Sequence, residues 1–439
     1  MEKAKEKKFT KVEKSWIMYD WANSVYATNI LAVLFPIYFG AVCEQSGADN
    51  LVLWSYGTSA ATFLVAILAP VLGSLADHKG HKKKLFAASL FVGVAFTLSN
   101  AFVEDYRLLL LGYVLSHIGF SGSCLFYDSF LTDVTTPERM DRVSSWGYAM
   151  GYIGGSTIPF IISIVILFTM GMTNMLAFKL VIILTSVWWL VFSIPTLLHV
   201  KQVHYVEAKR GRLFRSTFSN LWKTAKDIAK NKRVLLFILA YFFYIDGVNT
   251  VINMATSFGA TLGLDTNSLV VAILVIQLIA FPCTILSVRL SDKIGVMNTL
   301  LLFMGNYTVI AILGFVMGWG VEFHRFSADV GIKIFWALSI LVGTSQGGIQ
   351  ALSRSFFGRL VPPEKSNEYF GFYDIFGKFA AIMGPAMYAL VKAITGYSCF
   401  AILALSLLFI AGMLVMLKGR REIRLSRPLG TAGESGGNE

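Results

Sequence analysis

The stretch Tyr19-Asp20-Trp21-Ala22-Asn23-Ser24 lies inside a long apolar segment that runs to Phe39. It places a carboxylate, an amide and a hydroxyl in a segment long enough to cross a bilayer, which takes about 20 residues. A charged side chain in lipid costs a few kcal/mol, so such residues usually face a cavity. The pattern returns as Asp246-Gly247-Val248-Asn249-Thr250 in another apolar segment. These two segments predict a membrane protein with a duplicated polar site.

The composition supports this class, with 55% apolar and 15% charged residues against about 45–50% and 25% in soluble domains. Apolar runs predict an all-α polytopic protein with twelve membrane helices in two sets of six. The predicted helices span 17–40, 53–76, 85–103, 108–130, 144–168, 176–198, 234–257, 267–290, 298–319, 331–353, 368–391 and 398–417.

The basic residues favour one orientation in the membrane. With both termini inside, 31 of the 38 Lys and Arg residues fall on inner segments and only five on outer ones. Lys and Arg accumulate on the cytoplasmic side of membrane proteins. The net charge of +12 therefore needs no nucleic-acid partner, and we expect cytoplasmic termini and no cleaved signal peptide.

One long connection divides the chain. We expect an N-terminal bundle over 1–200, a cytoplasmic linker over 201–232, a C-terminal bundle over 233–425 and a disordered tail over 426–439. Within the linker, apolar residues such as Phe218 and Trp222 recur at helical spacing among Lys223, Lys226 and Lys230. This pattern predicts an amphipathic helix on the inner membrane face.

The two halves resemble each other at a constant offset of 226 residues. The matched pairs are Asp20 and Asp246, Asn23 and Asn249, Ser24 and Thr250, Ser129 and Ser355, Gly151 and Gly377, and Asp128 and Arg354. The last pair exchanges the sign of the charge. A parallel repeat is typical of two-bundle secondary transporters, whose substrate sites lie between the bundles.

The segment Gly73-Ser74-Leu75-Ala76-Asp77-His78-Lys79-Gly80-His81-Lys82-Lys83-Lys84 resembles the signature loop of the major facilitator superfamily. Gly73 and Gly80 allow close helix approach and chain reversal, and an acid such as Asp77 can meet a helix N-terminus. Lys82 and Lys83 are suited to acids and lipid headgroups. A weaker copy around Asp292 lacks the leading glycine and the basic run. We assign all these residues to an inner gate.

Other stretches resemble the vacuole-effluxer-like branch of that superfamily. They are Trp16 to Asn23, Phe35-Pro36-Ile37-Tyr38-Phe39, Gly347-Gly348-Ile349-Gln350-Ala351-Leu352-Ser353-Arg354-Ser355, Phe370-Gly371-Phe372-Tyr373, and Gly377-Lys378 through Gly384-Pro385. The branch contains fungal vacuolar amino-acid effluxers and bacterial permeases. The resemblance implies efflux of amino acids or similar small amphiphiles, and the short inner loops resemble the bacterial members of the cytoplasmic membrane.

Several membrane-embedded polar residues are candidates for substrate binding or coupling. They are Asp20, Asn23, Tyr26, Asp246, Asn249, Gln346, Gln350 and Lys378. Asp246 lies deeper in its helix than Asp20, which makes it the better candidate for proton coupling; Asp20 can belong to the inner gate instead. A structural role for these acids, in hydrogen bonds between the bundles, is an equal alternative to substrate binding or coupling. Gln346 and Gln350 are expected to face the cavity with Ser345.

Further residues are assigned to gating or structure. The resemblance suggests that Asp128 pairs with the Lys82–Lys84 cluster, and that Arg354 belongs to the same gate. Asp374 and Lys378 have i, i+4 spacing, which predicts an ion pair. His117 is interpreted as a satisfied buried histidine. The glycines of helix five, Gly147, Gly151, Gly154 and Gly155, form either a packing seam or a gating hinge. Four inert thiols are expected, with a Cys43–Cys399 disulfide as the alternative.

These observations favour a secondary transporter that works by alternating access, as two-bundle repeat proteins do. We expect it to act as a monomer on a small molecule, with or without protons. A membrane sensor or scaffold without transport is the alternative. An enzyme is not expected, since no recognisable catalytic dyad or metal cluster is present, and no cofactor or metal is predicted. The sequence contains no nucleotide-binding loop of the form Gly-x-x-x-x-Gly-Lys-Ser/Thr, so we do not expect ATP to drive transport.

Overall fold

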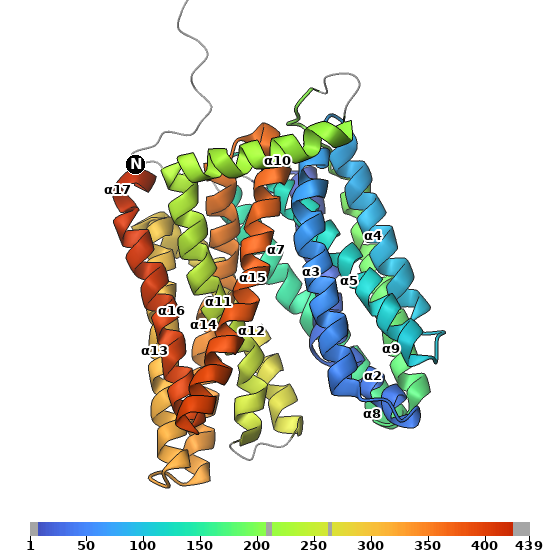
Figure 1. Ribbon diagram of the computed structural model, residues 1–439, viewed down its shortest axis with the longest axis vertical. Coiled ribbons are helices and arrows are strands. Elements are labelled where there is room, and N and C mark those ends of the chain that lie inside the picture. Colours follow the sequence, from blue (N-terminus) through green and yellow to red (C-terminus); the bar gives the residue numbers. More distant parts are fainter. Residues whose placement is uncertain (1–7, 208–212, 262–265, 425–439) are drawn as a thin grey trace, which may run out of the picture.

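The computed structural model describes residues 8–207, 213–261 and 266–424 and is almost entirely helical (Figure 1). The first half contains α1 (Lys11–Tyr26), η1 (Ala27–Ala32), α2 (Leu34–Gln45), α3 (Asn50–Ala76), α4 (His81–Ser99), α5 (Tyr106–Ser129), α6 (Leu131–Val134), α7 (Met140–Met150), η2 (Gly151–Thr157), α8 (Ile158–Met170) and α9 (Met175–His199). The second half contains α10 (Leu213–Lys230), α11 (Lys232–Thr261), α12 (Thr266–Ile294), α13 (Val296–Glu322), α14 (Ala328–Leu360), η3 (Pro363–Lys365), α15 (Ser366–Thr395), α16 (Ser398–Lys418) and α17 (Arg420–Arg424).

Within the described ranges, eleven helical stretches are long and apolar enough to cross a membrane. The predicted polytopic class is therefore confirmed. The remaining predicted segment, 85–103, corresponds to α4, which is not among the eleven because Lys82, Lys83 and Lys84 occupy its first turn. Every predicted span overlaps one helical stretch, and most helices extend several residues beyond the apolar run.

The helices form two groups that lie side by side (Figure 1). In the first group α1 packs on α9 and α4 on α5, and in the second α13 and α11 pack on α16. The groups meet where α3 contacts α15 and where α7 contacts α14 and α12. The predicted tail 426–439 lies outside the described residues. Helix α10 runs across one end of both groups and packs on α3, α11 and α15 (Figure 1).

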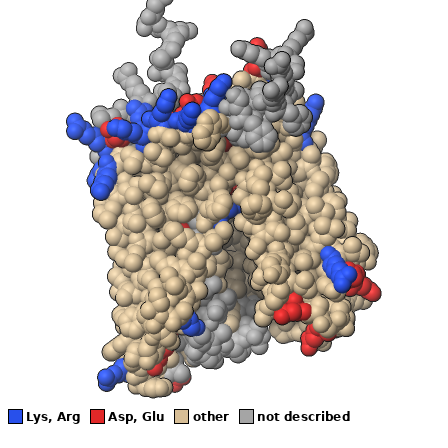
Figure 2. All heavy atoms as spheres, viewed as in Figure 1, with Lys and Arg blue, Asp and Glu red and all other residues tan. Residues whose placement is uncertain are grey.

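The two ends of the molecule differ in charge. Lys and Arg side chains gather at the end where α10 lies, and a hollow opens between the two groups toward the other end (Figure 2). We call the end with α10 and the α3–α4 turn the basic end. In α10, Ile228 of the predicted apolar face is buried together with Thr224, whereas Trp222 of that face is 67% exposed.

The first and fifth predicted segments contain a local change of helix geometry. Residues Ala27–Ala32 and Gly151–Thr157 are π-helical, and both π segments interrupt α-helices beside the hollow. Such π-helical turns are rare in proteins, and those that occur are often found at functional sites. The second one belongs to the glycine seam of helix five. A Cβ at Gly155 would lie 2.6 Å from Cβ of Ser24, so this seam packs directly on α1.

Candidate functional site

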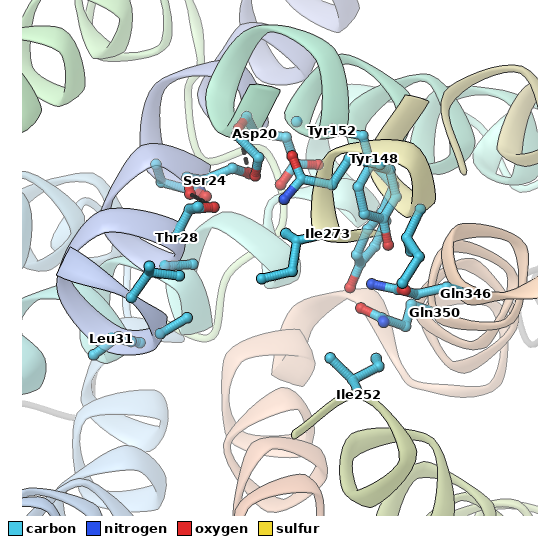
Figure 3. Close-up of a pocket in the computed structure, with 18 of the residues that line it drawn as sticks. Asp20, Ser24, Thr28, Leu31, Tyr148, Tyr152, Ile252, Ile273, Gln346 and Gln350 are labelled. Atoms are coloured by element: carbon cyan, nitrogen blue, oxygen red, sulfur yellow. Dashed lines mark hydrogen bonds between the residues drawn. The ribbon is translucent and has the colours of Figure 1, made fainter. Parts of the chain in front are cut away.

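A cavity of about 870 Å³ lies between the two helix groups (Figure 3). Its polar lining residues include Asp20, Asn23, Ser24, Thr28, Asp128, Tyr148, Tyr152, Gln277, Gln346, Gln350 and Arg354. Its apolar lining includes Leu31, Val33, Ile37, Ile252, Leu269, Ile273 and Ile276. A concave site with an apolar wall and a few convergent polar groups is typical of small-molecule binding.

Arg354 of α14 joins two carboxylates of the other half. Its Nη1 donates to Asp128 Oδ1 at 2.9 Å and its Nη2 to Asp20 Oδ2 at 3.1 Å. Ser144 of α7 accepts from Nε at 2.9 Å and, through its carbonyl, from Nη2 at 3.0 Å. Breaking such a pair leaves an uncompensated buried charge, which costs about 3–5 kcal/mol. We call Arg354, Asp20 and Asp128 the charge triad.

Aromatic rings surround the Arg354 guanidinium. Its Cζ lies 4.3 Å from the ring centre of Tyr148, 4.7 Å from Trp16 and 5.2 Å from Tyr127. The Tyr127 hydroxyl also donates to Asp20 Oδ2 at 2.8 Å. Arginine stacks on aromatic faces and binds carboxylates with a planar fork, so lysine is not equivalent to arginine in this position.

The charge triad corrects the predicted partner of Asp128 and locates Asp20. Asp128 does not pair with the Lys82–Lys84 cluster, because Arg354 reaches it across the boundary between the halves. Lys82 binds Asp133 instead. Asp20 lies both in the cavity lining and in the closing contact with Arg354. Asp20 therefore belongs both to the cavity and to the contact that closes it.

A smaller cavity of about 390 Å³ adjoins the first and shares Asp128, Tyr148 and Gln350 with it. Asn249 of α11 and the pair Asp374 and Lys378 of α15 line it. Lys378 Nζ contacts Asp374 Oδ2, which confirms the predicted i, i+4 ion pair. The structure thus brings Lys378 and Asn249 to the central space without placing them beside Asp20.

Asp246 lies elsewhere than expected. It is fully buried and does not line either cavity; its Oδ1 accepts from the Gly384 amide of α15 at 2.8 Å. Its Oδ2 and the Thr250 hydroxyl have no partner within the described parts of the chain. The prediction that Asp20 and Asp246 face one cavity is therefore wrong, although their helices are equivalent.

Tyr26 and Ser345 are also outside the cavity lining. The Tyr26 hydroxyl bonds to Ser116 at 2.8 Å inside the first group, and Ser345 accepts from Asn306 at 2.7 Å inside the second. Gln346 and Gln350 do line the cavity (Figure 3). Buried Oε1 of Gln346 has no partner among the described residues, and neither has Nδ1 of His117. The interpretation of His117 as a satisfied histidine is therefore wrong for that atom.

The sequence reasoning noted Ser24 in its opening stretch without listing it as a site residue, and it did not select the lining residues Thr28, Tyr148 and Tyr152. Ser24 and Thr28 are four residues apart, and so are Tyr148 and Tyr152. Ser24 and Thr28 continue the helix face that begins at Asp20. Side chains at i and i+4 share a helix face, so that spacing was the available signal. The tyrosines follow the same rule on α7 and η2.

The signature loop closes the basic end. Asp77 Oδ1 accepts from the Asn367 amide at 3.0 Å and from Asn367 Nδ2 at 2.7 Å, and Oδ2 accepts from the Glu368 amide at 3.0 Å. These donors belong to the first turn of α15, where a helix attracts negative charge. Burial raises the pKa of Asp77 to about 7, against the opposing effects of these donors and Lys82. Gly73 permits the approach, since its Cβ would meet the Asn367 backbone.

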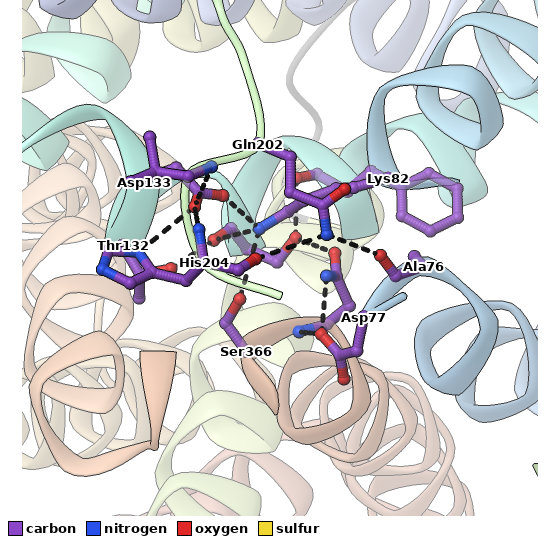
Figure 4. A network of polar contacts seen from close by, with 12 residues as sticks. Ala76, Asp77, Lys82, Thr132, Asp133, Gln202, His204 and Ser366 are labelled. Atoms are coloured by element: carbon purple, nitrogen blue, oxygen red, sulfur yellow. Dashed lines mark hydrogen bonds and ion pairs between the residues drawn. The ribbon is translucent and has the colours of Figure 1, made fainter. Parts of the chain in front are cut away.

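Lys82 and Asp133 form a fully buried ion pair beside this contact (Figure 4). Lys82 Nζ lies 2.7 Å from Asp133 Oδ2 and also donates to the Ser129 carbonyl and the Ser366 hydroxyl. It thereby joins both halves of the molecule. The neighbouring Lys83 is not part of this network, and Asp292 is exposed at the basic end of α12.

The segment after α9 fastens the same network. The amides of Val203 and His204 donate to Asp133 Oδ1 at 2.9 and 2.8 Å, and His204 Nδ1 lies 3.2 Å from the same oxygen (Figure 4). Gln202 bonds the Ala76 carbonyl and the Gly80 amide. The hydrogen bond to Asp133 raises the pKa of His204 against partial burial. Sequence reasoning missed Asp133 and His204, because neither lies in a recognisable motif.

Two further contacts across the halves follow the internal repeat. Ser129 donates to Asn367 Oδ1, and Ser355 donates to Asp141 Oδ1 at 2.5 Å. Ser129 and Ser355 are equivalent by the 226-residue offset, and so are Asp141 and Asn367. Asp141 also pairs with Arg359 at 2.8 Å. The closure is therefore built from matched positions of the two repeats.

Comparison with known proteins agrees with this architecture. The model of the family described as vacuole effluxer Atg22 like matches residues 52–137 and 132–422. The uncharacterized MFS-type transporter YxiO of Bacillus subtilis is 41% identical over 420 residues, which are 93% of this chain and 95% of YxiO. Autophagy-related protein 22-1 of Aspergillus clavatus is 28% identical over 66% of this chain, which spans only 52% of that relative.

Solved structures share the fold at low sequence identity. The human organic anion transporter MFSD10 superposes with a TM-score of 0.70 at 13% identity, covering 92% of this chain and 99% of MFSD10. A bacterial homologue of ferroportin in the outward-facing state gives 0.68 at 13% identity (94% and 98% covered), and the Escherichia coli fucose:proton symporter FucP gives 0.66 at 15% (93% and 97%). These proteins are transporters and not enzymes. The chain is a multi-pass membrane transport protein of the major facilitator fold and belongs to the vacuole effluxer Atg22-like family.

Proposed function

We propose that the protein exports amino acids or similar small amphiphiles by alternating access, as a monomer in a bacterial cytoplasmic membrane. The observation that carries the proposal is the asymmetry of the central cavity, which is closed at the basic end and opens toward the other (Figure 2). The abundance of Lys and Arg favours a cytoplasmic basic end. In this orientation the cavity is accessible from outside, as expected for the release step of an exporter.

The inward-facing state requires the closing contacts to separate. They include the charge triad, the Asp77 contact with α15, and the serine bonds to Asn367 and Asp141. Each joins one half to the other, whereas most helix packing lies within a half. Rocking of the halves about the central site is the usual movement of parallel-repeat transporters.

Asp246 is our candidate for proton coupling. It is 0% exposed, and within the described parts of the chain it accepts one hydrogen bond, from the Gly384 backbone amide, and forms no ion pair. Burying an unpaired carboxylate is costly, which favours its protonated, uncharged form in this state. A substrate-linked shift of α11 against α15 would change that environment, and the proton would then be exchanged.

Reconstituted protein tests both parts of the proposal. Vesicles loaded with labelled amino acids should release them faster than protein-free vesicles, and an opposing pH gradient should change the rate. Asp246→Asn should remove the effect of the gradient. Asp329→Asn, an equivalent change at an exposed position of α14, should retain it. If no substrate moves in either direction, the transport proposal fails; if Asp246→Asn keeps full gradient dependence, only the coupling proposal fails.

A further inference from the structure

The ionised side chains around the central space do not balance. Three carboxylates, those of Asp20, Asp128 and Asp374, line the two adjoining cavities together with two cations, Arg354 and Lys378. When all five are ionised, the site carries one excess negative charge. Low-dielectric walls strengthen the field of such a charge and raise the local concentration of opposite ions.

The excess charge is located at Asp128. Arg354 is shared between Asp20 and Asp128, and Lys378 is held by Asp374. The Asp128 side chain is 27% exposed, whereas Arg354 is only 3% exposed. Asp128 binds Arg354 through Oδ1, and within the described ranges no hydrogen bond is formed by its Oδ2. Asp128 lines both cavities, so this oxygen can accept from a ligand.

Other lining groups complement a cation in the same place. Tyr148 lines both cavities together with Asp128, and its ring already lies 4.3 Å from the Arg354 guanidinium, as expected from the attraction of aromatic faces for cations. Gln346 presents a buried acceptor, Oε1, that has no partner in the described structure. A buried acceptor without a donor is unfavourable, and a ligand N–H would satisfy it. Beyond these groups the wall is apolar, with Leu31, Ile252 and Ile273.

From this arrangement we infer that the cavity selects an organic monocation, meaning an amine with an apolar part and no carboxylate of its own. The inference rests on the proposed transport function and narrows its substrate class to cationic amphiphiles, in place of zwitterionic amino acids. A zwitterion would bring a carboxylate that has to displace Asp374 from Lys378, and an anion would meet the surplus carboxylate. A monocation neutralises the site without breaking either internal ion pair.

A matched ligand series separates these classes. Leucinamide, leucine and N-acetylleucine share one side chain and are a cation, a zwitterion and an anion at neutral pH. Binding to the purified full-length protein is measured by calorimetry and by ligand-induced thermal stabilisation. We expect leucinamide to bind at least tenfold more tightly than leucine, and N-acetylleucine to bind most weakly.

Variants locate the preference. In Asp128→Asn the ratio between leucinamide and leucine should fall to about one, whereas Asp329→Asn should keep the wild-type ratio. If Asp128→Asn does not fold, the wild-type series alone decides. Tighter binding of leucine or N-acetylleucine, or binding of none of the three at millimolar concentration, overturns the inference. Transport of leucine without any cation preference would overturn it and leave the proposed transport function standing.

Discussion

Arg354 and Asp128 are equivalent residues of the two repeats, 226 positions apart, and they bind each other at 2.9 Å. A contact between equivalent positions lies on the approximate twofold axis that relates the two halves. The exchange of sign between the repeats, acid in one and base in the other, turns what would be repulsion into an ion pair. Asp20 adds a second carboxylate from α1. We regard this contact as the centre of the closed basic end.

Arg354→Ala should therefore open the basic end. It leaves the carboxylates of Asp20 and Asp128 without their cation, which costs about 3–5 kcal/mol in the closed state. In a background without the four native cysteines, which are all free thiols, a cysteine at Ser366 should become reactive from the basic side. Arg354→Lys should restore protection only in part, because an ammonium cannot bind both acids as the fork does. Unchanged protection in Arg354→Ala would contradict this role.

Loss of Lys82 should destabilise the fold itself. Lys82 and Asp133 have side-chain exposures of 0%, so Lys82→Ala strands a buried carboxylate and should cost about 3–5 kcal/mol. Thermal unfolding in detergent measures the loss. The double variant Lys82→Met with Asp133→Leu should be more stable than either single change, since apolar replacement of both partners is often nearly neutral. Additive losses in the double variant would argue against a coupled pair.

The stability of the closed basic end should depend on pH through His204. Its pKa is raised by Asp133, so its stabilising effect is fully present below the ordinary pKa of about 6.5 and is lost as the pH rises through the raised value. Glu364 acts in the same direction and Lys82 against it. The side chain is 36% exposed, and solvent screening limits the effect to about 0.2–1 kcal/mol. The difference in melting temperature between wild type and His204→Gln should be largest at acidic pH. A difference that does not depend on pH would refute this.

Close packing of α4 on α5 should make Gly119 sensitive to substitution. A Cβ there would lie 2.6 Å from Gly93 Cα and 2.7 Å from the Ser89 carbonyl. Gly119→Ala should therefore lower stability by about 1–3 kcal/mol, the usual cost of overpacking. Gly305 on α13 is the matched control, with nothing within 4 Å of its Cβ position, and Ala there should be neutral or stabilising by about 0.5–1 kcal/mol. Equal melting temperatures for the two variants would show that the helices can separate without cost.

The helices and the repeat could be predicted from the sequence. A membrane span is recognised by about 20 apolar residues, and this pattern does not depend on which helix packs against it. The Asp374–Lys378 pair followed from spacing within one helix. The partner of Asp128 did not follow, since it depends on which end of the cavity is closed. Asp246 was misplaced for a related reason: equivalent helices need not rotate equally, and Gly384 offers α11 a backbone donor. Asp133 and His204 meet through a connection whose path hydropathy does not describe.

The most direct test of alternating access measures both ends of the molecule in one preparation. Spin labels at positions 79 and 364 report the separation of the halves at the basic end, and labels at positions 45 and 325 report the opposite end; all four residues are exposed. Electron spin resonance distances in liposomes should show two populations. We predict that whenever a ligand or pH lengthens the first distance, it shortens the second. Distances that stay fixed, or that lengthen together, would contradict alternating access and favour a sensor or scaffold.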